Sequence, residues 1–192
     1  MNNFCGIDYG SKLAGTTSIC FEVDNKLVFL QSEKKKDADK MIIQFFENLR
    51  IKQVFFDAPL SLPRAFFGEG EDFFYREGDR AIGAMSPMFL GGLTARAIKL
   101  KTTFEKTGIS FFEAYPGGLA KELNIKEKGY KKDSEQLIFL TEFISKNFDL
   151  KLKKHPSNWH QFDSLLAFVV GLRFNANQAL FFGDEGEGGI WV

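Results

Sequence analysis

The chain has 192 residues, of which 44% are hydrophobic, so it can bury one sizeable core, and we expect a single domain over residues 1–192. Its 25 basic and 25 acidic residues give a formal net charge of 0, which excludes a global electrostatic attraction to nucleic acid or to an anionic membrane. No apolar run reaches the length of a membrane span and no signal peptide is evident, so we expect a cytoplasmic protein without a membrane partner. Cys5 and Cys20 lack CxxC partners, which favours reduced thiols over a zinc site, with a disulfide across a hairpin as the alternative.

Three N-terminal segments have the composition of β-strands. They are residues 4–8, 16–23 and 27–31. The first segment ends in Asp8, a poor strand former, and breaks at Gly10. That pattern indicates either a turn or a ligand site at the mouth of a sheet. The turn signal Asp24-Asn25 joins the other two segments, so we expect an antiparallel meander.

A fourth strand follows an amphipathic helix and also ends in an aspartate. Apolar residues at helical spacing predict the helix over residues 38–49. Residues 53–57 then form an apolar run that ends in Asp57. A strand after a helix favours a crossover connection, so we expect this strand to lie parallel to the first. Asp8 and Asp57 would then lie side by side at the carboxyl edge of the sheet, where open α/β sheets bind ligands.

The middle of the chain is irregular before it returns to regular elements. Residues 61–92 are rich in glycine and charge without a clean period, which is typical of a functional or mobile segment. Residues 93–107 have the pattern of a helix. Residues 110–113 predict a fifth strand, which ends in Glu113 before a Pro-Gly stop.

Two helices are predicted in the last third of the chain. Residues 125–132 are basic and loop-like, and the next three residues are typical of a cap for a helix that runs to about residue 148. A second, apolar helix begins near residue 157 and ends near Phe174. Asp163 falls in its first turns, where the helix dipole also favours an acid. Residues 183–192 predict a loop followed by a short last strand.

Several short stretches, in this order along the chain, carry a resemblance to known proteins. They are Gly6-Ile7-Asp8, Asp57-Ala58-Pro59-Leu60, residues 76–80, Glu113-Ala114-Tyr115-Pro116, residues 160–163 and the closing residues 183–192. With the predicted elements, they resemble the ribonuclease-H-like fold of ribonucleases H, Holliday-junction resolvases and integrases. More closely, the chain resembles a domain-of-unknown-function family of predicted ribonuclease-H-like nucleases.

The resemblance implies a fold and a kind of site. The fold is α/β, with a mixed five-stranded sheet flanked by helices. The first three strands are antiparallel, and strands four and five lie parallel to strand one. The matching positions of that fold hold two divalent ions. The implied activity is hydrolysis of phosphodiester bonds in DNA or RNA.

Physical reasoning about the acids points to the same chemistry. Carboxylates that converge repel each other unless hard cations bind between them. We therefore predict that Asp8, Asp57 and Asp163 bind Mg²⁺ or Mn²⁺, with Asp8 as the bridging ligand. One ion would activate water and the other would stabilise the leaving oxygen, which is a two-metal nuclease mechanism.

Further residues are candidates for catalysis or for binding substrate. Glu113 is either a fourth catalytic carboxylate or the partner of Arg76 or Arg80. Lys12, Arg76 and Arg80 are candidates for phosphate contacts. His160 is a candidate for proton transfer or for a phosphate contact. Each also has a structural alternative: an exposed turn lysine, arginines paired with neighbouring acids, and a helix-entry histidine.

Two other functions fit parts of the pattern. A non-catalytic ribonuclease-H-like module that binds nucleic acid or protein agrees with the neutral net charge. Keeping three converging aspartates without ions would cost such a module stability. A phosphotransferase of the actin-like or sugar-kinase type uses a similar opening strand, but it needs two domains around a cleft, and we expect this chain to be too short. The basic clusters at residues 126–132 and 151–154 are either solvated faces or a track for a nucleic-acid backbone.

Overall fold

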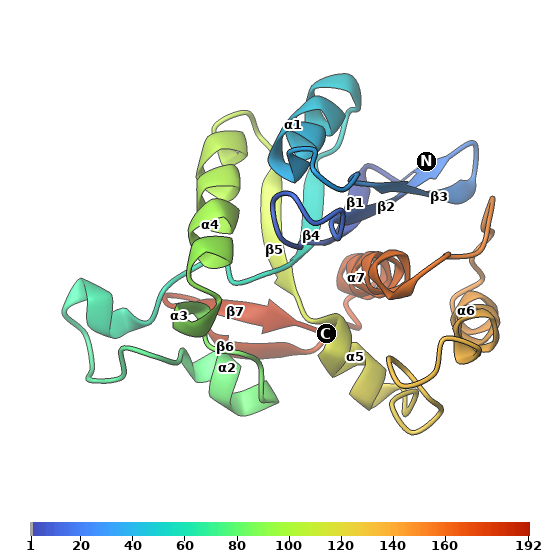
Figure 1. The fold of residues 1–192 in the computed structure, drawn as a ribbon. Coiled ribbons are helices and arrows are strands. Elements are labelled where there is room, and N and C mark those ends of the chain that lie inside the picture. The colour runs from blue at the N-terminus through green and yellow to red at the C-terminus, as the bar shows by residue number, and fades with distance from the viewer. Residues whose placement is uncertain (1) are drawn as a thin grey trace.

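Seven strands form one mixed sheet in the computed structural model, which describes residues 2–192 (Figure 1). The strands are β1 (Phe4–Asp8), β2 (Ser18–Val23), β3 (Lys26–Gln31), β4 (Gln53–Asp57), β5 (Ser110–Ala114), β6 (Phe181–Asp184) and β7 (Gly188–Trp191). Their spatial order is β3-β2-β1-β4-β5-β7-β6. The first three are antiparallel neighbours. β4 pairs parallel with β1, and β5 pairs parallel with β4, so the predicted directions of the first five strands are confirmed.

The predicted count of five strands is wrong, because a C-terminal hairpin extends the sheet. The last short strand is confirmed as β7, which lies parallel to β5, but β6 was not predicted. Glycine is a weak strand former, so this glycine-rich stretch favoured a loop. In the structure, a Cβ on Gly189 would lie 2.1 Å from ring atoms of Phe181. The aromatic ring thus fills the space that the missing side chain leaves.

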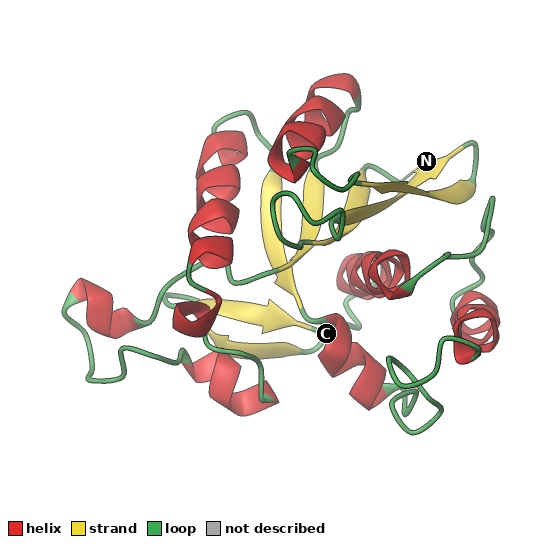
Figure 2. Cartoon of the chain, viewed as in Figure 1, coloured by secondary structure: helices red, strands yellow, loops and turns green. Residues whose placement is uncertain are grey.

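Helices cover both faces of the sheet (Figure 2). They are α1 (Ala38–Asn48), α2 (Glu77–Ile82), α3 (Pro87–Leu90), α4 (Gly92–Glu105), α5 (Pro116–Glu122), α6 (Gln136–Asn147) and α7 (Trp159–Asn175), with a 3-10 turn at Arg64–Phe67. Buried side chains of α1 and α4 pack on one face, and those of α5, α6 and α7 pack on the other. The segment without a clean period contains α2 and α3, which have 6 and 4 residues and are too short to show one.

The structure also tests the two cysteines and the expectation about membrane spans. Cys5 and Cys20 are both buried and both free, so the two thiols do not form a disulfide. Across residues 2–192, none of the helices combines the length and the apolar character that crossing a bilayer requires.

The central helix α7 lies directly against β1. Residues 162–171 are all buried, so this part of the helix contacts protein on every side. Gly6 permits the close approach, because a Cβ there would lie 2.1 Å from the backbone nitrogen of Phe168 and 2.4 Å from the carbonyl oxygen of Ser164. The hydroxyl groups of Ser18 and Ser164 are also hydrogen-bonded at 3.1 Å. This packing brings the first turns of α7 to the carboxyl end of β1.

Candidate metal centre at the carboxyl edge of the sheet

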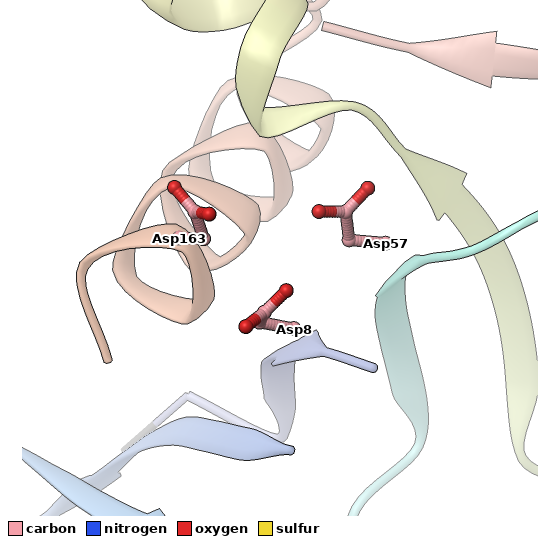
Figure 3. Close-up of side chains that lie close together, drawn as sticks. All are labelled: Asp8, Asp57 and Asp163. Carbon is pink, nitrogen blue, oxygen red and sulfur yellow. The ribbon is translucent and has the colours of Figure 1, made fainter. Parts of the chain in front are cut away.

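Three aspartates meet where β1, β4 and α7 converge, and Figure 3 shows their carboxylates facing one another. Asp8 and Asp57 are the last residues of β1 and β4, and the parallel register places them directly side by side. Asp163 projects from the second turn of α7. One carboxylate oxygen of each residue lies within 4.8 Å of one oxygen of the other two. The structure thus brings together the three acids that were predicted to share a site.

Protein donors already hold two of these carboxylates. The Tyr130 hydroxyl donates to Oδ1 of Asp163 at 2.5 Å, and Nζ of Lys131 lies 2.5 Å from Oδ2 of the same residue. Nδ1 of His160 lies 2.8 Å from Oδ2 of Asp8. His160 is therefore the predicted substrate-binding residue that the structure joins to the triad.

Asp57 is the unpartnered member of the triad. Within residues 2–192, its carboxylate accepts no hydrogen bond and forms no ion pair. It nevertheless faces the carboxylates of Asp8 and Asp163. An ionised carboxylate in a partly desolvated site needs a compensating donor or cation. Its oxygen atoms are hard ligands, which suit Mg²⁺ or Mn²⁺ better than a thiophilic metal.

Burial raises the pKa of all three carboxyl groups and is the largest cause in each, and repulsion from neighbouring acids adds to the shift at Asp57 and Asp163. The pKa of Asp57 lies well above the ordinary value, since Asp8 and Asp163 add like charge. The pKa of Asp8 is raised, although its hydrogen bond from His160 opposes the shift. The pKa of Asp163 rises to about 6, against the attraction of Lys131. The hydrogen bond to Asp8 in turn raises the pKa of His160.

These shifts predict that the metal-free protein loses stability as the pH rises from about 4 to 7. Between the ordinary aspartate pKa of 3.8 and the folded value of about 6, the folded state of Asp163 binds more protons than the unfolded state. The free energy of unfolding therefore falls with rising pH, by roughly 2–3 kcal/mol for this group alone. His160 acts in the same direction, because a raised folded pKa stabilises below the unfolded value of 6.5 and the gain is lost as the pH rises through the folded pKa.

The measurement is the melting temperature in EDTA between pH 4.5 and 7.5. We expect a downward slope for the parent chain and a shallower slope for Asp163→Asn. A flat or rising profile in the parent chain would contradict the electrostatic description of the site.

Glu113 lies outside the triad and holds Arg76. On β5 it pairs in register with Phe56 rather than Asp57, so strand alternation turns its side chain to the other face of the sheet. Its two carboxylate oxygens each accept a hydrogen bond from the Arg76 guanidinium at 2.7 Å, and Oε2 also accepts from the backbone N–H of Leu60 at 2.9 Å. Of the two roles considered for Glu113, the structure shows the ion pair with Arg76.

For Arg76, predicted to bind substrate, the structure shows the alternative of pairing with acids, because all of its guanidinium donors are used within the protein. Its side chain is 1% exposed, and its N–H groups donate to Asp79, Ser61 and Glu113. The other two predicted phosphate ligands are also paired away from the triad. Lys12 lies 3.2 Å from Asp37. Arg80 pairs with Asp72, and its guanidinium lies 4.5 Å from the centre of the Tyr75 ring.

Sequence reasoning missed Tyr130 and Lys131, which lie in the basic loop before α6. Tyr130 is 6% exposed and packs edge-on against Trp159 and beside Phe162 of α7. A tyrosine in an otherwise charged loop was the available signal, because a buried aromatic side chain anchors the loop that carries it. The anchored loop then delivers Tyr130 and Lys131 to Asp163.

A pocket of about 340 Å³ opens beside the triad. Its lining combines charged groups with apolar side chains, some of them from the segment between α2 and α4 and from α4 itself. Asp8, Asp57 and Lys131 are among the charged groups, and Met85, Leu90 and Leu93 are among the apolar ones. Asp8 and Asp57 therefore lie at a pocket that also presents apolar side chains.

No protein-family model, curated protein or solved structure matches this chain. The strand order and the contacts around Asp8, Asp57 and Asp163 are therefore the basis for a functional assignment.

Proposed function

We propose that this chain is a ribonuclease-H-like nuclease that hydrolyses phosphodiester bonds of DNA or RNA with Mg²⁺ or Mn²⁺. The observation that carries the proposal is the meeting of three aspartates from β1, β4 and α7, one of which has no partner among residues 2–192. The antiparallel β3-β2-β1 meander followed by parallel β4 and β5 supports the ribonuclease-H-like assignment.

The side chains around the triad orient the proposed ligands before an ion arrives. Asp8, Asp57 and Asp163 would hold the cations, which when bound activate water and stabilise the leaving oxygen of a phosphodiester. Tyr130 fixes the carboxylate of Asp163 through its 2.5 Å hydrogen bond. His160 does the same for Asp8 at 2.8 Å. Such outer contacts set the orientation and basicity of metal ligands.

The two alternative functions receive less support. In a non-catalytic module without cations, the unpaired carboxylate of Asp57 would lower stability without serving a function. A phosphotransferase of the actin-like or sugar-kinase type needs a cleft between two domains, whereas the seven strands found in residues 2–192 belong to one sheet.

The test is cleavage of end-labelled single-stranded, double-stranded and branched DNA and RNA with Mg²⁺ or Mn²⁺. We expect cleavage of at least one of these, none in EDTA, and a loss of about 100-fold or more for Asp8→Asn. The matched control is Asp24→Asn, because Asp24 is an exposed turn residue with φ 50°, where asparagine is well tolerated. Ion binding without cleavage of any nucleic acid would overturn the nuclease proposal in favour of a binding module or a small phosphorylated substrate.

A further inference from the structure

Lys131 places a positive charge against the triad. Its Nζ lies 2.5 Å from Oδ2 of Asp163, and its side chain lines the same pocket as Asp8 and Asp57. The ammonium group is attracted to all three carboxylates. The side chain is still 52% exposed, so it has room to turn toward solvent.

The backbone beneath Lys131 is held firmly. The residue adopts φ 59°, in the left-handed region that costs a lysine conformational energy. The neighbouring Tyr130 is buried against Trp159 and hydrogen-bonded to Asp163, which fixes the loop at this point. A fixed backbone with a flexible four-carbon stem lets the charge move while its base stays in place.

The position of the ammonium group conflicts with a cation on Asp163. Oδ1 of Asp163 already accepts from Tyr130, and Oδ2 contacts Lys131. A metal ion that binds Oδ2 would bring a second positive charge to the position that Nζ occupies. Like charges at such a distance repel strongly, so the ammonium group has to leave.

We propose that Lys131 is a built-in counter-ion that occupies the cation position on Asp163 and, when cations bind, turns to contact the phosphate of the substrate. The second half of this inference rests on the proposed nuclease function. The first half concerns the chain and the ion alone. The pocket supports the second half, because a released Lys131 side chain would stay beside the place where a phosphate would meet Asp8 and Asp57.

The first test compares the ion response of Lys131→Met with that of the parent chain. The melting temperature is measured against increasing MgCl₂ and MnCl₂. We expect Lys131→Met to lower the metal-free melting temperature and to reduce the half-saturating ion concentration about tenfold, since the competing charge is gone. A lysine that only stabilises the fold would lower the melting temperature and leave that concentration unchanged.

The matched control is Lys132→Met, which removes an exposed charge from the next position of the same loop. We expect this control to keep the half-saturating concentration of the parent chain. An unchanged or higher half-saturating concentration in Lys131→Met, or an equal decrease in both variants, would contradict the counter-ion role of Lys131.

The second test measures the phosphate contact. With the ion saturating, oligonucleotide binding is followed by fluorescence anisotropy over a range of salt concentrations. We expect Lys131→Met to weaken binding and to reduce the slope of log affinity against log salt by about one, whereas Lys131→Arg keeps both. An unchanged slope in Lys131→Met would overturn the phosphate contact.

The two proposals fail in different ways. If Lys131→Met binds ions more tightly but no nucleic acid is cleaved, the counter-ion role of Lys131 is supported and the nuclease function is contradicted. If nucleic acid is cleaved and the ion affinity of Lys131→Met is unchanged, the nuclease function is supported and the counter-ion role is contradicted. A chain whose melting temperature responds to neither ion would overturn both.

Discussion

Replacing Asp57 with asparagine is expected to raise the melting temperature of the metal-free protein at pH 7.5 and to abolish its stabilisation by Mg²⁺ or Mn²⁺. The carboxylate of Asp57 repels those of Asp8 and Asp163 and has no compensating partner in residues 2–192. Burial and the neighbouring acids raise the pKa of Asp57 in the folded state, which costs stability at pH 7.5, so replacing this ionisable group with a neutral amide stabilises the metal-free protein. The same change removes an anionic oxygen ligand, so the ion loses affinity.

The two expected effects of Asp57→Asn have opposite signs: the metal-free protein gains stability, and stabilisation by the ion is lost. In the parent chain, an ion at one hundred times its dissociation constant adds about 2.7 kcal/mol to the free energy of unfolding. For a chain of this size that is roughly 5–10 °C in melting temperature. We expect a gain of a few degrees without metal for Asp57→Asn and no further gain when the ion is added.

Scanning fluorimetry in EDTA and in MgCl₂ measures both quantities on one sample. Asp24→Asn is the matched control, because it removes the same charge from an exposed turn outside the triad. We expect it to behave as the parent chain does in both buffers. A destabilised metal-free Asp57→Asn variant would mean that the carboxylate is needed by the fold. An ion response that survives in this variant would remove Asp57 from the site.

Two members of the triad, Asp8 and Asp57, were predictable from local patterns in the sequence. Asp8 and Asp57 each end an apolar strand, and the helix between those strands indicated a parallel pair, which sets both acids at one edge. Asp163 was recognisable as an acid early in an apolar helix. Its meeting with the strand acids depends on the close contact at Gly6, which the sequence alone does not reveal.

Other features required knowledge of pairing between distant segments. Strand alternation would have placed Glu113 on the opposite face from Asp57, but only once the β4–β5 register was known. The hairpin of β6 and β7 was hidden by glycines whose neighbours supply the packing. Lys131 lies in a loop without regular structure, and its position follows from the docking of Tyr130 onto α7. None of these placements leaves a periodic signal in the chain.

Arg76 is expected to be the charged side chain whose removal costs the most stability. It is 1% exposed and donates to two buried carboxylates, those of Asp79 and Glu113. Arg76→Met would leave both acids without their main partner in the interior. Breaking a buried pair from one side costs about 3–5 kcal/mol. For a chain of this size, we expect a fall of roughly 10 °C in melting temperature.

The matched control for Arg76→Met is Arg80→Met, in the helix α2 that Arg76 caps. Arg80 is 61% exposed and its partner Asp72 is also accessible, so solvent screens the pair. We expect its melting temperature to change by less than about 2 °C. Comparable losses in both variants would contradict the distinction between a buried and an exposed ion pair.

A double variant separates an unpaired buried charge from a simple loss of packing. In Arg76→Met with Glu113→Gln, one of the two stranded acids becomes neutral, so the double variant is expected to be more stable than Arg76→Met alone. Loss of packing around the arginine stem predicts the reverse, because the two losses would add.

Arg76 also lies close in the chain to the pocket. Its backbone N–H donates to Asp79, and this contact begins α2, which leads into Met85 in the pocket lining. We expect the half-saturating Mg²⁺ concentration to stay within about twofold of the parent value in the folded single variant, because Arg76 contacts no member of the triad. A large loss of ion affinity in that variant would show that Arg76 contributes to ion binding.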